Sequence, residues 1–164
     1  MNRSTASIIQ EMVLHDQGNP HRVQHFMKVY AFAQMIATEE KLNESQQELI
    51  EVAAVMHDIG IRDSIKKYGS NAGPLQEKEG PPLAKAMLSR LSFPQPFIDR
   101  ICFLIGHHHT YTDIDGMDYQ ILIEADFLVN IFEHKIHRDA IQNILIKYFQ
   151  TETGKNLLKS MYLS

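Results

Sequence analysis

The chain has 164 residues, of which 44% are hydrophobic and 22% are charged, a balance typical of one soluble domain with its own core. Its formal net charge of -4 argues against nucleic-acid or membrane-surface binding through bulk electrostatics. The single cysteine, Cys102, excludes an internal disulfide and a thiolate metal site within one chain. We therefore expect one domain over residues 1–164 and a small molecule as partner, and the sequence leaves the oligomeric state open.

No targeting or membrane-spanning segment is apparent. The N-terminal sequence MNRSTASIIQ lacks a continuous apolar stretch, and no apolar run approaches the roughly 20 residues that cross a bilayer. We expect a cytoplasmic protein.

Capping residues and apolar periodicity predict two long helices in the first third of the chain. Asn19 as cap and Pro20 in the first turn begin a helix that ends near Thr38. The next helix begins at one of two capping pairs and stops at Gly60. These pairs are Asn43 with Gln46 and Ser45 with Glu48.

Residues 62–80 show a weaker pattern, which predicts a short helical turn followed by a functional loop. Pro81 and Pro82 predict the start of a helix that runs to about Leu91.

The rest of the chain also has helical spacing. Pro96 predicts a helix through about His108, residues 109–118 form a loop, and residues 119–137 form a long helix. C-terminal helices follow over residues 138–163. Because strand alternation is not evident anywhere in the sequence, the predicted fold class is all-α, a single helical bundle.

Polar residues occupy core positions in four of these helices. Extending each apolar stripe by one turn leads to one histidine or aspartate: His25, His57, His108 and Asp126. Asp58 follows His57 directly. A single buried histidine is usually a hydrogen-bonded core residue, but several such groups together are stabilised by one shared cation. The pattern therefore predicts a metal site.

The residue types narrow the choice of metal. Imidazoles and carboxylates without thiolates suit Mn, Fe, Co, Ni or Zn better than Ca, which prefers oxygen ligands alone. The sequence does not choose among these divalent ions.

The arrangement resembles the HD superfamily of metal-dependent phosphohydrolases, whose signature is a separated histidine, an adjacent His-Asp pair and a distant aspartate. The matching residues are His25 in HFMKVYAFAQMIA, His57 and Asp58 in AAVMHDIG, and Asp126 in ILIEADFLV. The resemblance covers about residues 20–135 and implies that these four side chains bind the metal. It also implies a helical core of the HD-domain type.

The resemblance further implies hydrolysis of a phosphoester in a small phosphorylated metabolite, with a nucleotide as the expected substrate. A bound metal would activate water, and Asp58 would orient that water or accept its proton. Arg62 follows the His-Asp pair closely enough to clamp a phosphate, which adds it to the candidate catalytic residues.

The sequence departs from two-metal members of this superfamily, which usually carry a further histidine after the His-Asp pair. The span from Ile59 to Gly106 has none, which favours one metal. His107, His108 and Glu79 remain candidates for a second metal or for substrate binding, with the helical register favouring an inward His108.

The remaining histidines and acidic residues near the predicted helix ends are interpreted as surface groups without a role in metal binding. His21 is expected to be exposed in the first turn of its helix. Glu133, His134 and His137 suggest a second metal site, but charged helix ends are common and we discount it.

Two alternative functions stay open. A non-haem di-iron oxygenase of the HD type would need the second ligand set, so metal stoichiometry distinguishes it. A non-catalytic metal- and nucleotide-binding sensor module would bind a nucleotide tightly without forming product.

Overall fold

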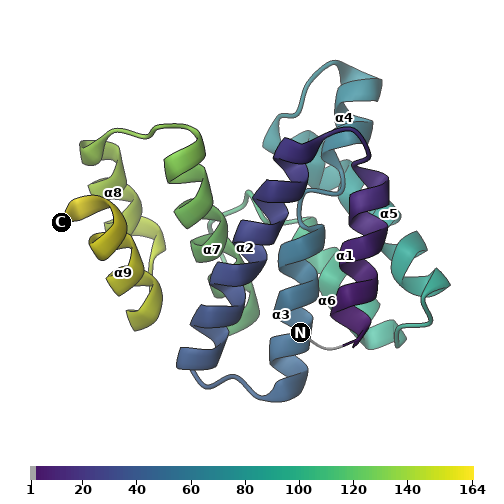
Figure 1. The fold of residues 1–164 in the computed structure, drawn as a ribbon, viewed down its shortest axis with the longest axis horizontal. Helices are drawn as coiled ribbons and strands as arrows, with labels where there is room; N and C mark the ends of the chain where they lie inside the picture. Colours follow the sequence, from purple (N-terminus) through teal and green to yellow (C-terminus); the bar gives the residue numbers. More distant parts are fainter. Residues whose placement is uncertain (1–2) are drawn as a thin grey trace.

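The computed structural model describes residues 3–164, and in this range the chain forms helices and connecting loops without a strand. Figure 1 shows the helices as a bundle, with α2 (Pro20–Glu39) and α3 (Glu44–Met56) at its centre. The long helix α7 (Met117–Glu133) lies beside them and contacts both. The predicted all-α fold class is confirmed.

Helix α3 is buried on every side near its C-terminal end. All seven residues from Ile50 to Met56 are buried, because α3 contacts α1 (Arg3–His15), α2, α6 (Gln95–Ile105) and α7. A helix that is apolar on all faces is stable only inside a core. The end of α3, where His57 lies, is therefore deep in the protein.

Side-chain caps set the starts of the two central helices as the sequence predicts. The Asn19 side chain accepts a hydrogen bond from the backbone N–H of Arg22 at 3.2 Å. Of the two capping pairs considered for α3, Asn43 and Gln46 form the box, with both reciprocal hydrogen bonds present.

The N-terminal helix α1 was not predicted from the sequence. Its inner face contributes Ile8 and Met12, both fully buried, and α1 packs against α3. Two apolar pairs four residues apart, Ile8 with Met12 and Ile9 with Val13, are a short periodic signal in isolation. The neighbouring α3 supplies the surface against which this helix packs.

The region from residue 61 to 90 differs most from the prediction. It contains α4 (Ile61–Tyr68), which ends at Gly69 with a left-handed φ of 67°, and α5 (Gly73–Arg90). The prediction that Pro81 and Pro82 open a helix is wrong, since both lie inside α5.

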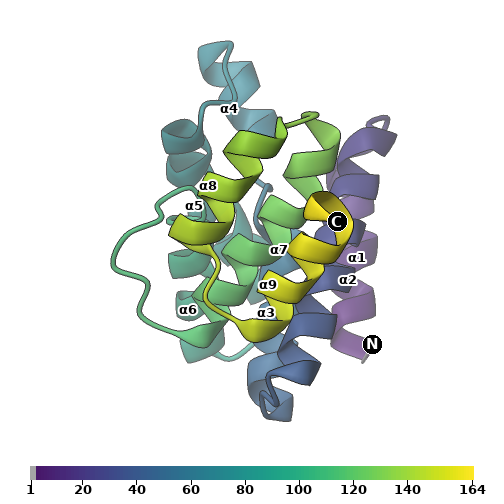
Figure 2. The same ribbon diagram turned by 90° about the vertical axis from the view of Figure 1, so that its left-hand side faces the viewer.

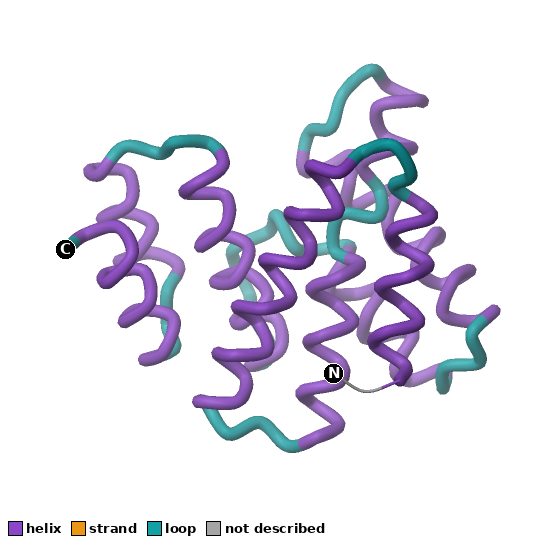
Figure 3. Tube along the Cα trace, viewed as in Figure 1, coloured by secondary structure: helices purple, strands orange, loops and turns teal. Residues whose placement is uncertain are grey.

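Tertiary contacts explain why α5 extends ahead of its prolines. The His109 backbone N–H and the Thr110 hydroxyl both donate to Glu77, which anchors this first half. Gly60 approaches the same helix so closely that an added Cβ would lie 2.6 Å from the Gln76 carbonyl oxygen and 2.7 Å from the Gly80 nitrogen. The expected functional loop shrinks to the few residues between α4 and α5, as Figure 3 shows.

Two other helices end earlier than predicted. Helix α6 stops at Ile105 rather than near His108, and α7 stops at Glu133 rather than at residue 137. Lys135 then adopts a left-handed φ of 51°, which turns the chain away from the α7 axis.

The C-terminal elements α8 (Arg138–Tyr148), α9 (Glu152–Leu158) and the wide helical turn η1 (Lys159–Leu163) lie beside α7 (Figure 2). The buried Glu124 of α7 fixes this layer, since it accepts hydrogen bonds from the backbone and hydroxyl of Thr151. Among residues 3–164, no helix is both long and apolar enough to cross a membrane.

Candidate metal centre

The four predicted metal ligands come together from three helices. His25 lies on α2, His57 and Asp58 lie at the end of α3, and Asp126 lies in the middle of α7. His25 Nε2 is 3.3 Å from His57 Nε2, 3.4 Å from Asp58 Oδ2 and 3.3 Å from Asp126 Oδ1. His57 Nε2 is 3.5 Å from the same oxygen atom of each aspartate. Two ligands that each lie about 2.1 Å from a shared ion are separated by about 3.0 to 3.4 Å, so this spacing fits a divalent metal.

Hydrogen bonds on the outer ring nitrogens orient the histidines. His25 Nδ1 contacts Glu133 Oε2 at 2.8 Å, and His57 Nδ1 contacts the Ala54 carbonyl oxygen at 2.8 Å. Because a carboxylate and a carbonyl can only accept, each Nδ1 carries the hydrogen and donates it. Each neutral ring then has its lone pair on Nε2, directed into the site. This is the usual arrangement of histidine ligands and their supporting acceptors in metal sites.

The inner atoms of the site need a cation. When both rings are neutral, as metal-binding histidines are, the lone pairs of His25 and His57 face each other across 3.3 Å. Asp126 Oδ1 and His108 Nε2 are buried and make no hydrogen bond among the described residues. Unsatisfied buried acceptors are costly, and a divalent ion bound between them removes that cost. The residues present therefore fit a metal ion.

The pKa values of these groups show the same need for positive charge. Burial by itself lowers the pKa of His57, but Asp58 and Asp126 outweigh it and raise the pKa to about 9. The pKa of His25 is also raised, since Asp126 and Asp58 together outweigh its burial and the repulsion from His57. Burial acts to raise the pKa of both aspartates, yet their neighbouring histidines hold it well below the usual range.

A second group of ligand atoms shares Asp58. Asp58, His108 and His109 also form a cluster in which one potential ligand atom of each residue lies within 4.8 Å of the others. Asp58 Oδ1 is 3.5 Å from His108 Nε2, whereas its Oδ2 faces the first group. His108 Nδ1 donates to the Ile105 carbonyl oxygen at 2.7 Å, which directs Nε2 inward. Asp58 thus lies between two potential ion positions.

A cavity of about 330 Å³ opens above the first group. It is lined by the predicted ligands His25, Asp58 and Asp126 and by further polar groups. These further groups are His21, Arg22, Asn71, Gln76, His109, Asn130, Glu133 and His134. The cavity is large enough for a small polar molecule to reach these three side chains.

Comparison with known proteins identifies the family of the chain. The HD domain family model matches residues 22–148, well over half of the sequence. The chain belongs to the HD domain family. The resemblance found from the sequence is thereby confirmed.

A solved crystal structure is similar to this HD domain over nearly its whole length. It is described as that of a predicted HD superfamily hydrolase from an uncultured Thermotogales bacterium. The TM-score is 0.67 and the identity is 26%, with 98% of this chain and 84% of that chain covered. No curated protein sequence matches this HD domain.

The structure does not bring three other candidates to the metal centre. Arg62 lines a separate surface pocket and donates to the His15 carbonyl oxygen at 2.7 Å. Glu79 accepts hydrogen bonds from Lys67 and Tyr68, which joins α4 to α5. His107 stacks on Phe103 with ring centroids 4.2 Å apart and donates from Nδ1 to its carbonyl oxygen.

Three residues of this HD domain gain roles that the sequence analysis did not give them. Glu133 supports His25 directly, although it had been interpreted as part of a charged helix end. His109 joins the second group, and burial lowers its pKa to about 4, so the ring stays neutral and able to bind an ion. Arg22 lines the cavity where a phosphate-binding cation was expected from Arg62. The spacing of Arg22, three residues before His25, was a usable signal, because residues three apart share one helix face.

Proposed function

We propose that this HD domain is a metal-dependent phosphohydrolase that acts on a small phosphorylated metabolite, with a nucleotide as the expected substrate. The observation that supports the proposal is the convergence of His25, His57, Asp58 and Asp126 on one point, where the buried Asp126 Oδ1 has no hydrogen-bond donor among the described residues. A divalent ion held there supplies a Lewis acid for a phosphoryl oxygen and lowers the pKa of bound water.

The chain's own residues have distinct tasks in this reaction. Asp58 lines the cavity, and its pKa is held low by His57 and His108 against the effect of burial. It is therefore ionised at neutral pH and can orient a water molecule or accept its proton. Glu133 keeps the His25 ring in place through its hydrogen bond to Nδ1.

Arg22 takes the phosphate-binding task in this proposal, in place of Arg62. Its side chain lines the cavity, and it is held in place by Asp16, whose Oδ1 lies 3.3 Å from Nη1. A guanidinium binds phosphate oxygens through two parallel hydrogen bonds. Asn71 and Gln76 line the same cavity and offer further polar contacts.

The test is hydrolysis by protein whose metal content has been measured. We expect phosphate release from at least one member of a nucleotide and sugar-phosphate panel, and its loss on chelation. Asp126→Asn should abolish the activity, whereas Asp139→Asn, on the exposed face of α8, should leave it unchanged. Metal-loaded protein that releases no phosphate from any phosphoester would overturn the proposal.

The di-iron oxygenase remains the second candidate because of the group formed by Asp58, His108 and His109. Two iron ions per chain together with oxygen consumption would favour it. One ion per chain with phosphate release would favour the phosphohydrolase. The sensor alternative predicts tight nucleotide binding without either reaction.

A further inference from the structure

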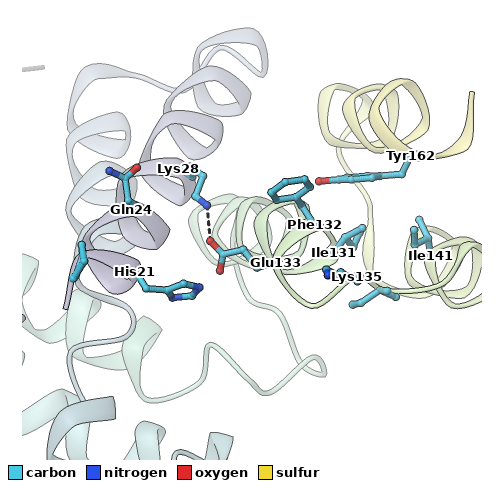
Figure 4. A pocket seen from close by; sticks show the side chains of 11 residues that line it. His21, Gln24, Lys28, Ile131, Phe132, Glu133, Lys135, Ile141 and Tyr162 are labelled. Carbon is cyan, nitrogen blue, oxygen red and sulfur yellow. Dashed lines mark hydrogen bonds and ion pairs between the residues drawn. The ribbon is translucent and has the colours of Figure 1, made fainter.

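A larger cavity lies beside the metal centre and has a different chemical character. It measures about 650 Å³ and lies between α2 and the C-terminal end of α7, with α8 and the C-terminal turn on its far side (Figure 4). This volume is in the range of cavities that bind small organic ligands. None of the predicted metal ligands lines it.

The cavity adjoins the metal pocket. His21 and Glu133 line both spaces, so the two cavities meet at these residues. Glu133 forms the divide, because Oε2 holds His25 Nδ1 at 2.8 Å and Oε1 holds Lys28 Nζ at 2.5 Å. A molecule with its phosphate at the metal could therefore place its organic part in the larger cavity.

The walls of the larger cavity suit a flat apolar group. Three isoleucines, Ile131, Ile136 and Ile141, lie there with the rings of Phe132 and Tyr162. Phe132 is 70% exposed at the last turn of α7, next to the inward-facing Glu133. Because the Tyr162 hydroxyl donates to the Leu128 carbonyl oxygen at 2.5 Å, its ring is fixed in position. Aromatic faces of this kind bind a planar ring by stacking.

Positive charge borders this apolar surface. Lys28 and the exposed Lys135 both line the cavity, and Lys135 stands on the left-handed turn that follows α7. Since Lys28 is already paired with Glu133, the ammonium of Lys135 is the better placed to meet a further anionic group of a ligand. An aliphatic sugar phosphate would use neither the rings nor the isoleucines.

We propose that this cavity binds the nucleobase of the substrate while the phosphate lies in the metal pocket, an inference that rests on the proposed function. Phe132 is then a specificity residue that contacts the base, and His21 and Glu133 lie beside the sugar. The ligand class is a purine or pyrimidine nucleotide.

A binding experiment tests the cavity independently of catalysis. Each of the four common ribonucleosides, which carry no phosphate, is titrated into the full chain while the isoleucine methyl groups are followed by NMR. We expect saturable shifts at Ile131, Ile136 and Ile141 for at least one nucleoside, and their loss in Phe132→Ala. Leu14→Ala, which removes a similarly exposed apolar side chain from α1, should keep them. Absence of shifts, or equal shifts in Phe132→Ala, would overturn the proposal.

A kinetic experiment separates this inference from the proposed function. Phe132→Ala should lower kcat/KM for the best nucleotide about tenfold, mainly through KM, because one stacking contact is lost. Hydrolysis of glycerol phosphate by the same variant should stay unchanged. An equal loss for both substrates would overturn the base site. If the wild type hydrolyses no phosphoester, the proposed function fails, and the nucleoside titration still decides whether the cavity binds a base.

Discussion

Binding of a metal ion should stabilise this protein strongly, and Asp126→Asn should remove most of that effect. The substitution keeps the shape of the side chain but removes the charge of a buried oxygen that lies 3.3 Å and 3.5 Å from the two histidine nitrogens. An ion that binds only the folded state stabilises it by about 2.7 kcal/mol at a concentration of one hundred times Kd. For a chain of this size, that corresponds to a rise in Tm of about 5 to 10 °C.

The expected loss in the variant follows from the same relation. Loss of a supporting contact around a metal ligand already lowers affinity about 10- to 100-fold, and loss of the charge of a direct ligand should reach at least the upper value. At an unchanged metal concentration, a hundredfold weaker site retains about 0.4 kcal/mol of stabilisation, or roughly 1 °C.

The assay is thermal unfolding with and without Mn²⁺, Fe²⁺, Co²⁺, Ni²⁺ or Zn²⁺ in chelator-treated protein, with Asp139→Asn as a surface control of the same chemistry. A cooperative unfolding transition in metal-free Asp126→Asn shows that the variant folds. If this folded variant keeps the full metal-dependent rise in Tm, Asp126 is not a ligand and the proposed geometry of the centre is refuted.

Three further predictions concern the same region. Glu133→Ala should weaken metal binding about 10- to 100-fold, because the proposed ligand His25 loses its hydrogen-bond acceptor, and competition with a coloured chelator measures this. An unchanged affinity would show that Glu133 has no supporting role. Gly60→Ala should lower the free energy of unfolding by about 1 to 3 kcal/mol, since the new Cβ meets backbone atoms of α5 at 2.6 and 2.7 Å, and urea unfolding that shows no loss would contradict this close approach. Burial acts to lower the pKa of His57, but the adjacent carboxylates outweigh it and raise the pKa from 6.5 to about 9. Protonation of His57 therefore stabilises the metal-free fold fully below about pH 6.5, and this stabilisation is lost as the pH rises through 9. The proton also competes with the metal, so the metal-dependent rise in Tm should grow from pH 6.5 to 9, and a rise that shrinks over this range would be inconsistent with His57 as a ligand.

Local sequence patterns were sufficient for the features that depend on neighbouring residues. Asn19 and Asn43 cap α2 and α3 as predicted, because an N-cap hydrogen bond involves residues within one turn. The helical repeat likewise placed His25, His57 and Asp126 on the inner faces of their helices. The all-α class follows from the same repeat.

The two prolines of α5 show where prediction from local sequence patterns fails. Pro81 and Pro82 are good helix starters when considered alone, yet α5 begins at Gly73. The first half of this helix is held by Glu77, which accepts hydrogen bonds from the turn after α6, more than 30 residues away. No pattern within residues 73–90 contains that information.

The residues of the metal centre fall into the same two groups: those that the sequence pattern predicts and those that only tertiary contacts bring to the site. The sequence by itself determined that His25, His57, His108 and Asp126 are polar groups at core positions, because helical periodicity specifies which side of a helix a residue faces. Only the tertiary structure decided that His109 and Glu133 join them, and that Arg22 lines their cavity while Arg62 and His107 lie elsewhere. The physical reason is that the direction of a side chain beyond a helix end depends on the turn that follows, and the packing of separate helices sets that turn.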